Sequence, residues 1–267
     1  MKDEKVNYDG LFTILIQGPL DDTSLNNISN YKKFGDVVVS YWSDKELDSK
    51  YNSQVTPIRG MLPDTQQLYH LASRAPTFYY SLTSMYNGTL ACKTPYVVKV
   101  RSDESFTDLS HLLDHFLEND ERVVCGNIFH KRSKGFHMGD HIFVCKTDVL
   151  KATTDFLIKR SQLSEPYEPE EVSKTFPSPE AALCRAMLIT AGVGCSKLSY
   201  DSYFASVDIR NLGDHCVKWN HGIVTETGQE TTAKRVIKAP IKRHYKTKIW
   251  DSTKGESFWF PDCEPTL

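Results

Sequence analysis

Short apolar runs alternate with amphipathic stretches along the first half of the chain. Residues 11–17 form an apolar run rich in β-branched side chains and closed by a Gly-Pro pair, and residues 36–42 form a second such run. Runs of this length and composition predict buried strands. Residues 21–34, between them, begin with capping side chains and carry apolar positions at helical spacing, which predicts a helix. A strand, a helix and a strand within about 30 residues form a βαβ unit. The sequence therefore predicts a mostly parallel sheet flanked by helices.

The same patterns predict further elements as far as residue 191. Strands are expected at residues 96–101, 122–129 and 141–145, and helices at 64–75, 77–90, 107–119, 148–160 and 180–191. Pro76 is expected to break the helical stretch around it, because proline lacks an amide donor and clashes with the preceding turn. Irregular segments are expected at residues 45–63, 130–140 and 164–179, and no element is assigned after residue 210.

Composition places the chain among ordinary globular proteins. Of its 267 residues 40% are hydrophobic and 25% charged, and 32 basic against 34 acidic residues give a net charge of −2. This balance argues against nucleic acid as a partner, and no apolar run approaches the roughly 18 residues that span a bilayer. The N-terminus is polar and unlike a signal peptide, and seven scattered cysteines make a poor disulfide framework. We therefore expect a cytoplasmic protein with reduced thiols.

Polar residues follow the first two predicted strands. Gln17 and Gly18 end the first strand, and Asp44 follows the second. Ligands of parallel sheets gather at the carboxyl ends of the strands, and a glycine there permits close backbone approach. These residues are candidates for nucleoside contacts; ordinary turn chemistry is the alternative.

Lys99, Arg101 and Asp103 occupy alternate positions at the end of the third predicted strand, so their side chains are expected on one face. Buried charges are costly unless they are paired. The group is therefore either an internal salt-bridge cluster or a polyanion site, in which the cations bind a diphosphate and the carboxylate holds a divalent metal. The pattern alone leaves both open.

Four segments together resemble one protein family. They are Ile14 to Leu20, Val38 to Trp42, Tyr96 to Glu104 and His137 to Phe143. In this order and spacing they are similar to the WavE-like lipopolysaccharide-synthesis proteins, a family of glycosyltransferases with a GT-A type fold. The resemblance covers residues 11 to about 190 and implies a Rossmann-like sheet that binds a nucleotide-sugar along its carboxyl edge. We expect one α/β, GT-A-like domain over residues 1–267. Its parts would be a nucleotide-binding half (11–100), a metal and acceptor half (101–210) and a C-terminal extension packed on the body (211–267).

The resemblance also implies a metal. GT-A enzymes hold Mn²⁺ or Mg²⁺ against the donor diphosphate with an Asp-x-Asp motif at the end of a central strand. This chain departs from that motif, because Arg101 stands at the first acidic position. Asp103 and Glu104 remain as metal ligands, with His244 as a distant third. Arg101 could neutralise part of the diphosphate charge, which would weaken the dependence on metal. The residues expected to contact the donor are Gln17, Gly18, Asp44, Arg59, Lys99, Arg101 and Ser102.

Two acids are candidates for the base that an inverting transferase needs. Glu180 follows Pro-Ser-Pro at a helix N-terminus, a place that resembles the base of many inverting GT-A enzymes. Its alternative role is stabilisation of the helix dipole. Asp140 precedes a predicted strand and could hold the sugar or the acceptor; the alternative is a turn residue with no ligand. We favour Glu180 as the base.

Residues 234–248 contain seven Lys and Arg and no acid. Such a run is either a solvated surface or a flap that closes over the donor diphosphate, with His244 reaching the metal. We expect a hexosyl- or pentosyltransferase that moves a sugar from a nucleoside-diphosphate donor, a UDP-sugar, to a hydroxyl of a glycan or glycoconjugate. The alternatives are a nonenzymatic nucleotide-sugar-binding protein and, from the His-x-x-Asp-His grouping at residues 137–141, a metal-dependent hydrolase. A nucleotidyltransferase normally has a Gly-rich, basic loop after the first strand, which this chain lacks.

Overall fold

The computed structural model describes residues 6–43, 46–60, 75–119, 122–127, 138–162, 179–194, 196–217, 223–224 and 230–231. The strands of the main sheet are β1 (Phe12–Pro19), β2 (Asp36–Trp42), β3 (Thr56–Gly60), β4 (Tyr96–Arg101), β6 (Val123–Gly126), β7 (Ile142–Lys146) and β8 (Phe204–Val207). Two small sheets pair β5 (Ser105–Phe106) with β9 (His215–Cys216), and β10 (Ile223–Val224) with β11 (Glu230–Thr231). The helices are α1 (Asp22–Leu25), α2 (Ile28–Tyr31), α3 (Ala75–Ala91), α4 (Ser110–Leu117), α5 (Thr147–Gln162), α7 (Pro179–Thr190) and α8 (Lys197–Tyr203), and short 3-10 turns lie at Ser49–Tyr51 and Ile209–Asn211.

The main sheet has the strand order β3-β2-β1-β4-β7-β6-β8. All neighbouring strands are parallel except β7, which runs antiparallel to both β4 and β6. The chain adds β2 and β3 on one side of β1 and then crosses to place β4 on the other side. The strand order therefore reverses between β1 and β4, and such a switch point opens a crevice at the carboxyl ends of the two strands.

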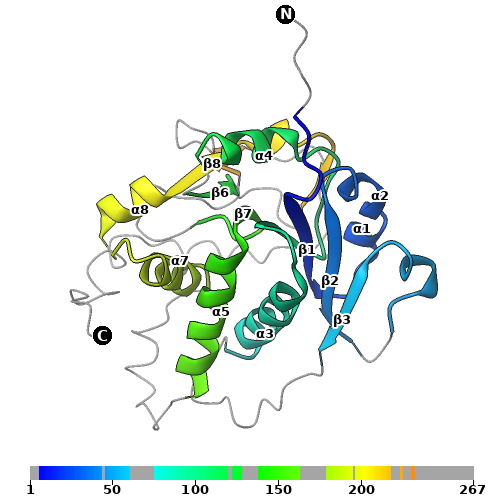
Figure 1. Cartoon of the computed structure of the whole chain (residues 1–267), viewed down its shortest axis with the longest axis horizontal. Helices are drawn as coiled ribbons and strands as arrows, with labels where there is room; N and C mark the ends of the chain where they lie inside the picture. The colour runs from blue at the N-terminus through cyan, green and yellow to red at the C-terminus, as the bar shows by residue number, and fades with distance from the viewer. Residues whose placement is uncertain are drawn as a thin grey trace, which may run out of the picture.

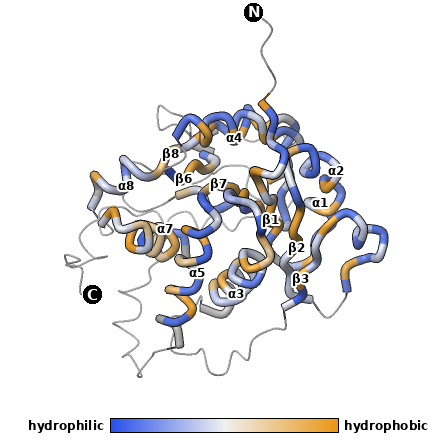
Figure 2. Tube along the Cα trace, in the orientation of Figure 1, coloured by the Kyte–Doolittle hydropathy of each residue, from blue (hydrophilic) through white to orange (hydrophobic). Residues whose placement is uncertain are grey.

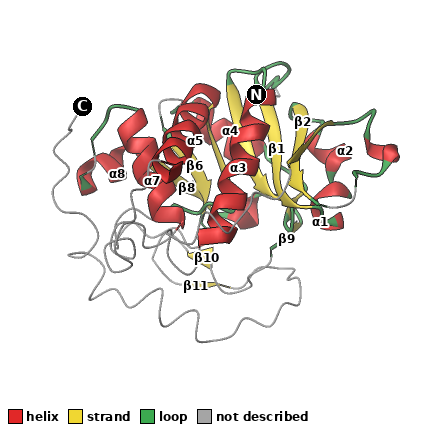
Figure 3. Cartoon of the chain, turned by 90° about the horizontal axis from the view of Figure 1, so that it is seen from below, coloured by secondary structure: helices red, strands yellow, loops and turns green. Residues whose placement is uncertain are grey.

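Helices cover both faces of this sheet (Figure 1; Figure 3). Helices α3, α5 and α7 lie on one face, and α1, α2 and α4 on the other. The strands alternate accordingly, since Leu15 packs in the core under α3 whereas Ile14 and Ile16 pack in the opposite core. Figure 2 shows hydrophobic residues over most of α7, and residues 181–188 of this helix are all buried. The prediction of a mostly parallel α/β sheet flanked by helices is confirmed.

Several expected boundaries are corrected. Residues 21–34 form two short helices, α1 and α2, instead of one. The segment 45–63, expected to be irregular, contains the edge strand β3, which a proline and only five residues made hard to see. Helix α3 already begins at Ala75, because Pro76 lies in the first turn, where a helix needs no amide donor. The helix expected from residue 107 begins at Ser110, after β5.

Other expected elements lie partly or wholly outside the described residues: the helix at 64–75 except its last residue, the loop at 164–178, and most of the loop at 130–140. No helix in the described part of the chain is long and apolar enough to cross a membrane.

Candidate functional site at the carboxyl edge of the sheet

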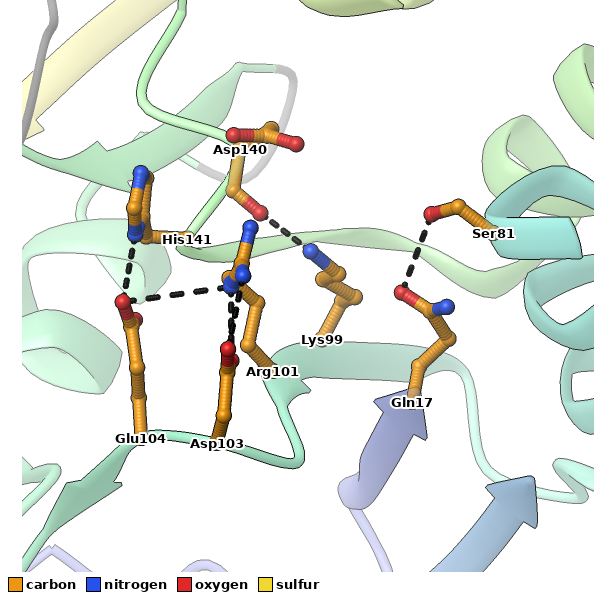
Figure 4. Close-up of polar contacts among 8 residues, drawn as sticks. All are labelled: Gln17, Ser81, Lys99, Arg101, Asp103, Glu104, Asp140 and His141. Atoms are coloured by element: carbon orange, nitrogen blue, oxygen red, sulfur yellow. Dashed lines mark hydrogen bonds and ion pairs between the residues drawn. The ribbon is translucent and has the colours of Figure 1, made fainter. Parts of the chain in front are cut away.

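The ends of β1 and β4 lie side by side at the switch point. Gln17 on β1 is in register with Arg101 on β4, and the amide of Ser102 donates to the carbonyl of Gln17 at 3.0 Å. Leu15 and Lys99 form the preceding matched pair, so Gln17, Lys99 and Arg101 share the face that α3 covers. The hydroxyl of Ser81 on α3 lies 3.4 Å from Oε1 of Gln17 (Figure 4). The sheet therefore presents the amide of Gln17 and the guanidinium of Arg101 in one row across β1 and β4, with Lys99 two residues earlier on the same face.

Lys99 is almost fully buried, with 1% of its surface exposed. Its ammonium donates to the backbone carbonyl of Asp140 and lies 5.8 Å from the centroid of the Phe143 ring. Burial lowers the pKa of Lys99, and the nearby charge of Asp140 opposes this shift. Lys99 is thus a fixed internal cation beneath the edge of the sheet, and it holds the backbone at Asp140.

Arg101 and Asp103 form a two-pronged ion pair. Nε and Nη2 of Arg101 donate to the two carboxylate oxygens of Asp103 at 2.8 and 2.9 Å. Burial disfavours the charged guanidinium, but the hydrogen bonds to Asp103 and the charge of Glu104 outweigh it and raise the pKa of Arg101. The pair remains accessible to solvent, with 27% of the Arg101 side chain and 16% of the Asp103 side chain exposed.

Glu104 is fully buried and ties the end of β4 to the start of β7. Its Oε1 lies 2.6 Å from Nδ1 of His141 and 3.9 Å from Nε of Arg101. The backbone amide of Arg101 also donates to the carbonyl of His141 at 3.2 Å. In Figure 4 the Arg101 side chain lies between the carboxylates of Glu104 and Asp103 and the ammonium of Lys99. The sequence singled out Arg101 and Glu104 as site residues, but it offered His141 only within the His-x-x-Asp-His grouping and did not predict its pairing with Glu104.

The two candidate bases lie near one buried thiol. Asp140 is half-buried just before β7, and Glu180 lies in the first turn of α7. The amide of Met138 donates to the sulfur of Cys184 at 3.1 Å, which docks the segment before Asp140 on α7. Burial raises the pKa of the Cys184 thiol, and the charges of Glu180 and Asp140 raise it further. Met138, two residues before Asp140, therefore docks on the helix whose first turn holds Glu180.

The remaining donor candidates have separate positions. Gly18 adopts φ +145°, and a methyl group there would collide with Oγ of Ser102, which is buried and has no hydrogen-bond partner among the described residues. Arg59 lies on the edge strand β3, where it donates to the carbonyl of Ser43 at 3.1 Å and pairs with Glu46 at 3.5 Å. Arg59 is thus two strands away from β1. Asp44 and His244 lie outside the described residues.

A metal would need several free carboxylate, imidazole or thiolate donors close together. Within the described ranges, no three or more His, Cys, Asp or Glu side chains form such a group. Both oxygens of Asp103 accept from Arg101, and Oε1 of the buried Glu104 faces His141. The described residues therefore do not fit a metal centre, and no step is derived through one.

Sequence reasoning missed an aromatic pair beside this row. Trp42 at the end of β2 and Tyr80 on α3 are both partly exposed, and their ring centroids lie 6.0 Å apart with the planes tilted by 37°. The available signal was an indole at the carboxyl end of a strand next to the switch point. This aromatic pair thus joins β2 to α3, the helix whose Ser81 contacts Gln17 on β1.

Comparisons with known proteins give similarities of architecture. No protein-family model and no curated protein matches the chain, so membership of the WavE-like family stays an expectation. The glycosyltransferase GlyE of Streptococcus pneumoniae is 9% identical, matched over 75% of this chain and 46% of its own, with a TM-score of 0.42.

Two further solved structures have comparable scores. Glucosyl-3-phosphoglycerate synthase of Mycobacterium tuberculosis, solved with Mn²⁺, UDP and phosphoglyceric acid, is 11% identical over 74% of this chain and 68% of its own, with a TM-score of 0.41. The 2-C-methyl-D-erythritol 4-phosphate cytidylyltransferase of Thermus thermophilus is 9% identical over 83% of this chain and 92% of its own, with a TM-score of 0.40. The structural neighbours of this chain thus include glycosyltransferases, but with TM-scores below 0.5 and identities of 9–11% they assign neither a family nor a substrate to it.

Proposed function

We propose that this chain is a glycosyltransferase that moves a sugar from a nucleoside-diphosphate donor to a hydroxyl of a glycan or glycoconjugate. The observation that carries the proposal is the row of Gln17 and Arg101, with Trp42 beside it, at the carboxyl edge where the strand order reverses. Two carboxylates, Asp140 and Glu180, lie just before β7 and in the first turn of α7. This combination suits a ligand with a planar base, a charged diphosphate and a reacting carbon.

The row suggests how the donor lies. The base packs against Trp42 and Tyr80, and the amide of Gln17 with the hydroxyl of Ser81 offers hydrogen bonds to its polar edge. The diphosphate then extends across β1 toward Arg101, with the charge of Lys99 beneath it. In this arrangement residues 11–100 form the nucleotide-binding half, and residues 101–210 supply the acceptor side.

The chemistry requires a base and a stabilised leaving group. We propose that Glu180 accepts the proton of the acceptor hydroxyl as its oxygen attacks the anomeric carbon. The bond from that carbon to the diphosphate breaks, and its electron pair leaves with the nucleoside diphosphate, whose developing charge Arg101 stabilises. Asp140, whose backbone Lys99 holds, is proposed to orient the sugar or the acceptor.

An assay of donor turnover tests this function. The protein is incubated with UDP-, GDP- and dTDP-sugars, with and without Mn²⁺, and released nucleoside diphosphate is measured. We expect release from one class of donor, and we expect Glu180→Gln to lower kcat by about 10²- to 10⁴-fold with little change in donor KM. Glu118→Gln, at the exposed end of α4, is the matched control and should behave as the wild type.

A nonenzymatic nucleotide-sugar-binding protein is the second candidate. The observation that favours it is the missing first acid of the Asp-x-Asp motif, where Arg101 stands and pairs with Asp103. Tight binding of a donor with no release of nucleoside diphosphate would select this candidate. Absence of both binding and release with every donor class would contradict both functions.

A further inference from the structure

The resemblance implies a metal held by Asp103 and Glu104. In the structure both acids are paired with other side chains of the protein. Nε and Nη2 of Arg101 donate to the two oxygens of Asp103. Nε also lies 3.9 Å from the carboxylate of Glu104. Glu104 is also held by His141 at 2.6 Å. A divalent ion entering here would have to displace a charge-assisted fork, which is among the stronger hydrogen-bonded pairs in proteins. The arrangement therefore places a guanidinium against the two acids that the resemblance assigns to the metal.

The charges of the cluster support the same reading. Lys99 and Arg101 are two basic residues beside three acids, Asp103, Glu104 and Asp140. Arg101 pairs with Asp103 and also lies near Glu104, so both acids that the resemblance assigns to the metal already face a guanidinium.

Arg101 is placed to contact an anion. Its side chain is 27% exposed at the end of β4, and the fork to Asp103 uses Nε and Nη2 only. Nη1 makes no hydrogen bond within the described part of the chain. A guanidinium held along one edge by a carboxylate keeps its other edge for phosphate oxygens, and its planar donors suit them.

We infer that Arg101 takes the place of the divalent cation and binds the donor diphosphate directly, with Asp103 and Glu104 as positioning residues that hold its side chain. This inference rests on the proposed function. It gives Asp103 and Glu104 a role different from the metal-ligand role expected from the resemblance. Lys99 supplies the second positive charge from beneath the sheet edge and makes no contact with the donor.

Binding of nucleoside diphosphates with and without metal tests the inference. UDP, GDP and dTDP are titrated by calorimetry into the full chain in EDTA, in Mg²⁺ and in Mn²⁺. We expect the best ligand to bind in EDTA within about 3-fold of its affinity in Mn²⁺, a difference under 1 kcal/mol. Arg101→Gln should weaken binding about 10- to 100-fold in EDTA and in metal alike, as loss of hydrogen bonds to a charged group implies.

Further variants separate positioning from ligation. Arg101→Lys keeps the charge but not the fork and should recover only part of the affinity. Asp103→Asn keeps one acceptor for Arg101 and should weaken binding less than Arg101→Gln does, equally with and without metal. Arg210→Gln is the matched control, because Arg210 forms the same two-residue fork with Asp208 three strands away and should bind nucleotide as the wild type. Unliganded melting temperatures establish that each variant is folded.

The outcomes are distinct. Nucleotide binding that appears only with Mn²⁺ or Mg²⁺, and that Asp103→Asn abolishes, would overturn the inference and leave the proposed function in place. No binding of any nucleoside diphosphate under any condition would remove the proposed function and this inference with it.

Discussion

The burial of one lysine, Lys99, lowers the stability of the folded protein, because its charge is removed from water. Lys99 is 1% exposed, and its main partner is a backbone carbonyl instead of a carboxylate. Burial lowers its pKa, because the charged ammonium is better solvated in water than in the protein interior. Residues that are retained at such a cost commonly serve function more than stability. We propose that Lys99 places a charge beneath the proposed diphosphate site, and its hydrogen bond holds the backbone at Asp140.

Lys99→Met therefore separates stability from binding. We expect the variant to unfold at no lower urea concentration than the wild type at pH 7, because an apolar side chain replaces a buried charge. Because its pKa is lowered in the native state, the Lys99 ammonium loses its proton more readily in the folded wild type than in the unfolded chain. Wild-type stability relative to the variant should accordingly rise with pH between the lowered pKa and 10.5, the ordinary lysine value.

Urea unfolding at pH 7, 9 and 10 measures that difference, and calorimetry with the best nucleoside diphosphate measures binding. We expect affinity to fall about 10-fold or more in the variant. A stability difference that stays flat or falls with pH, or a variant that binds as tightly as the wild type, would contradict the role assigned to Lys99.

At the scale of elements, α3 reaches the carboxyl edge because it packs unusually close to the sheet. A methyl group on Gly88 would collide with Leu15 of β1 and with Ser40 of β2. Nearby, the hydroxyl of Ser40 donates to the carbonyl of Ser84 at 2.6 Å, and that of Ser84 donates to the carbonyl of Ser40 at 2.8 Å. These contacts set the height at which Tyr80 and Ser81 meet Trp42 and Gln17.

Gly88→Ala should therefore destabilise the protein, although alanine is the better helix former. Propensity alone favours alanine by about 1 kcal/mol, whereas overpacking a tight contact costs about 1–3 kcal/mol. We expect a lower melting temperature by thermal unfolding. Asn87→Ala, one position away in the same helix and partly exposed, is the control for propensity. An equal or higher melting temperature for Gly88→Ala would show that α3 does not need this close approach.

Local patterns predicted the elements that have strong periodicity and missed those held by distant partners. β1, β2 and β4 were readable because each is a run of buried apolar residues. β3 was not, because its pattern is exposed and partly polar and it exists only by pairing with β2. The break between α1 and α2 was also missed, since apolar residues at helical spacing continue across it.

At the scale of the whole molecule, the sheet brings together residues that are far apart in the sequence. The positions of Gln17, Lys99, Arg101 and Asp103 at one edge followed from parallel pairing, which the sequence predicted. Their partners did not follow, because the pairing of Glu104 with His141 depends on β7 running antiparallel beside β4. The aromatic pair depends in the same way on how α3 packs over β2. Strand order and helix packing therefore determine the site as much as the residue types do.

A crystal structure of the protein with bound UDP, or with the nucleoside diphosphate that binds best, tests the central claim most directly. We expect the base to pack against Trp42 and Tyr80, and a phosphate oxygen to lie within hydrogen-bonding distance of Arg101 while Asp103 still holds that guanidinium. A nucleotide bound away from the ends of β1 and β4, or a diphosphate that never contacts Arg101, would contradict it.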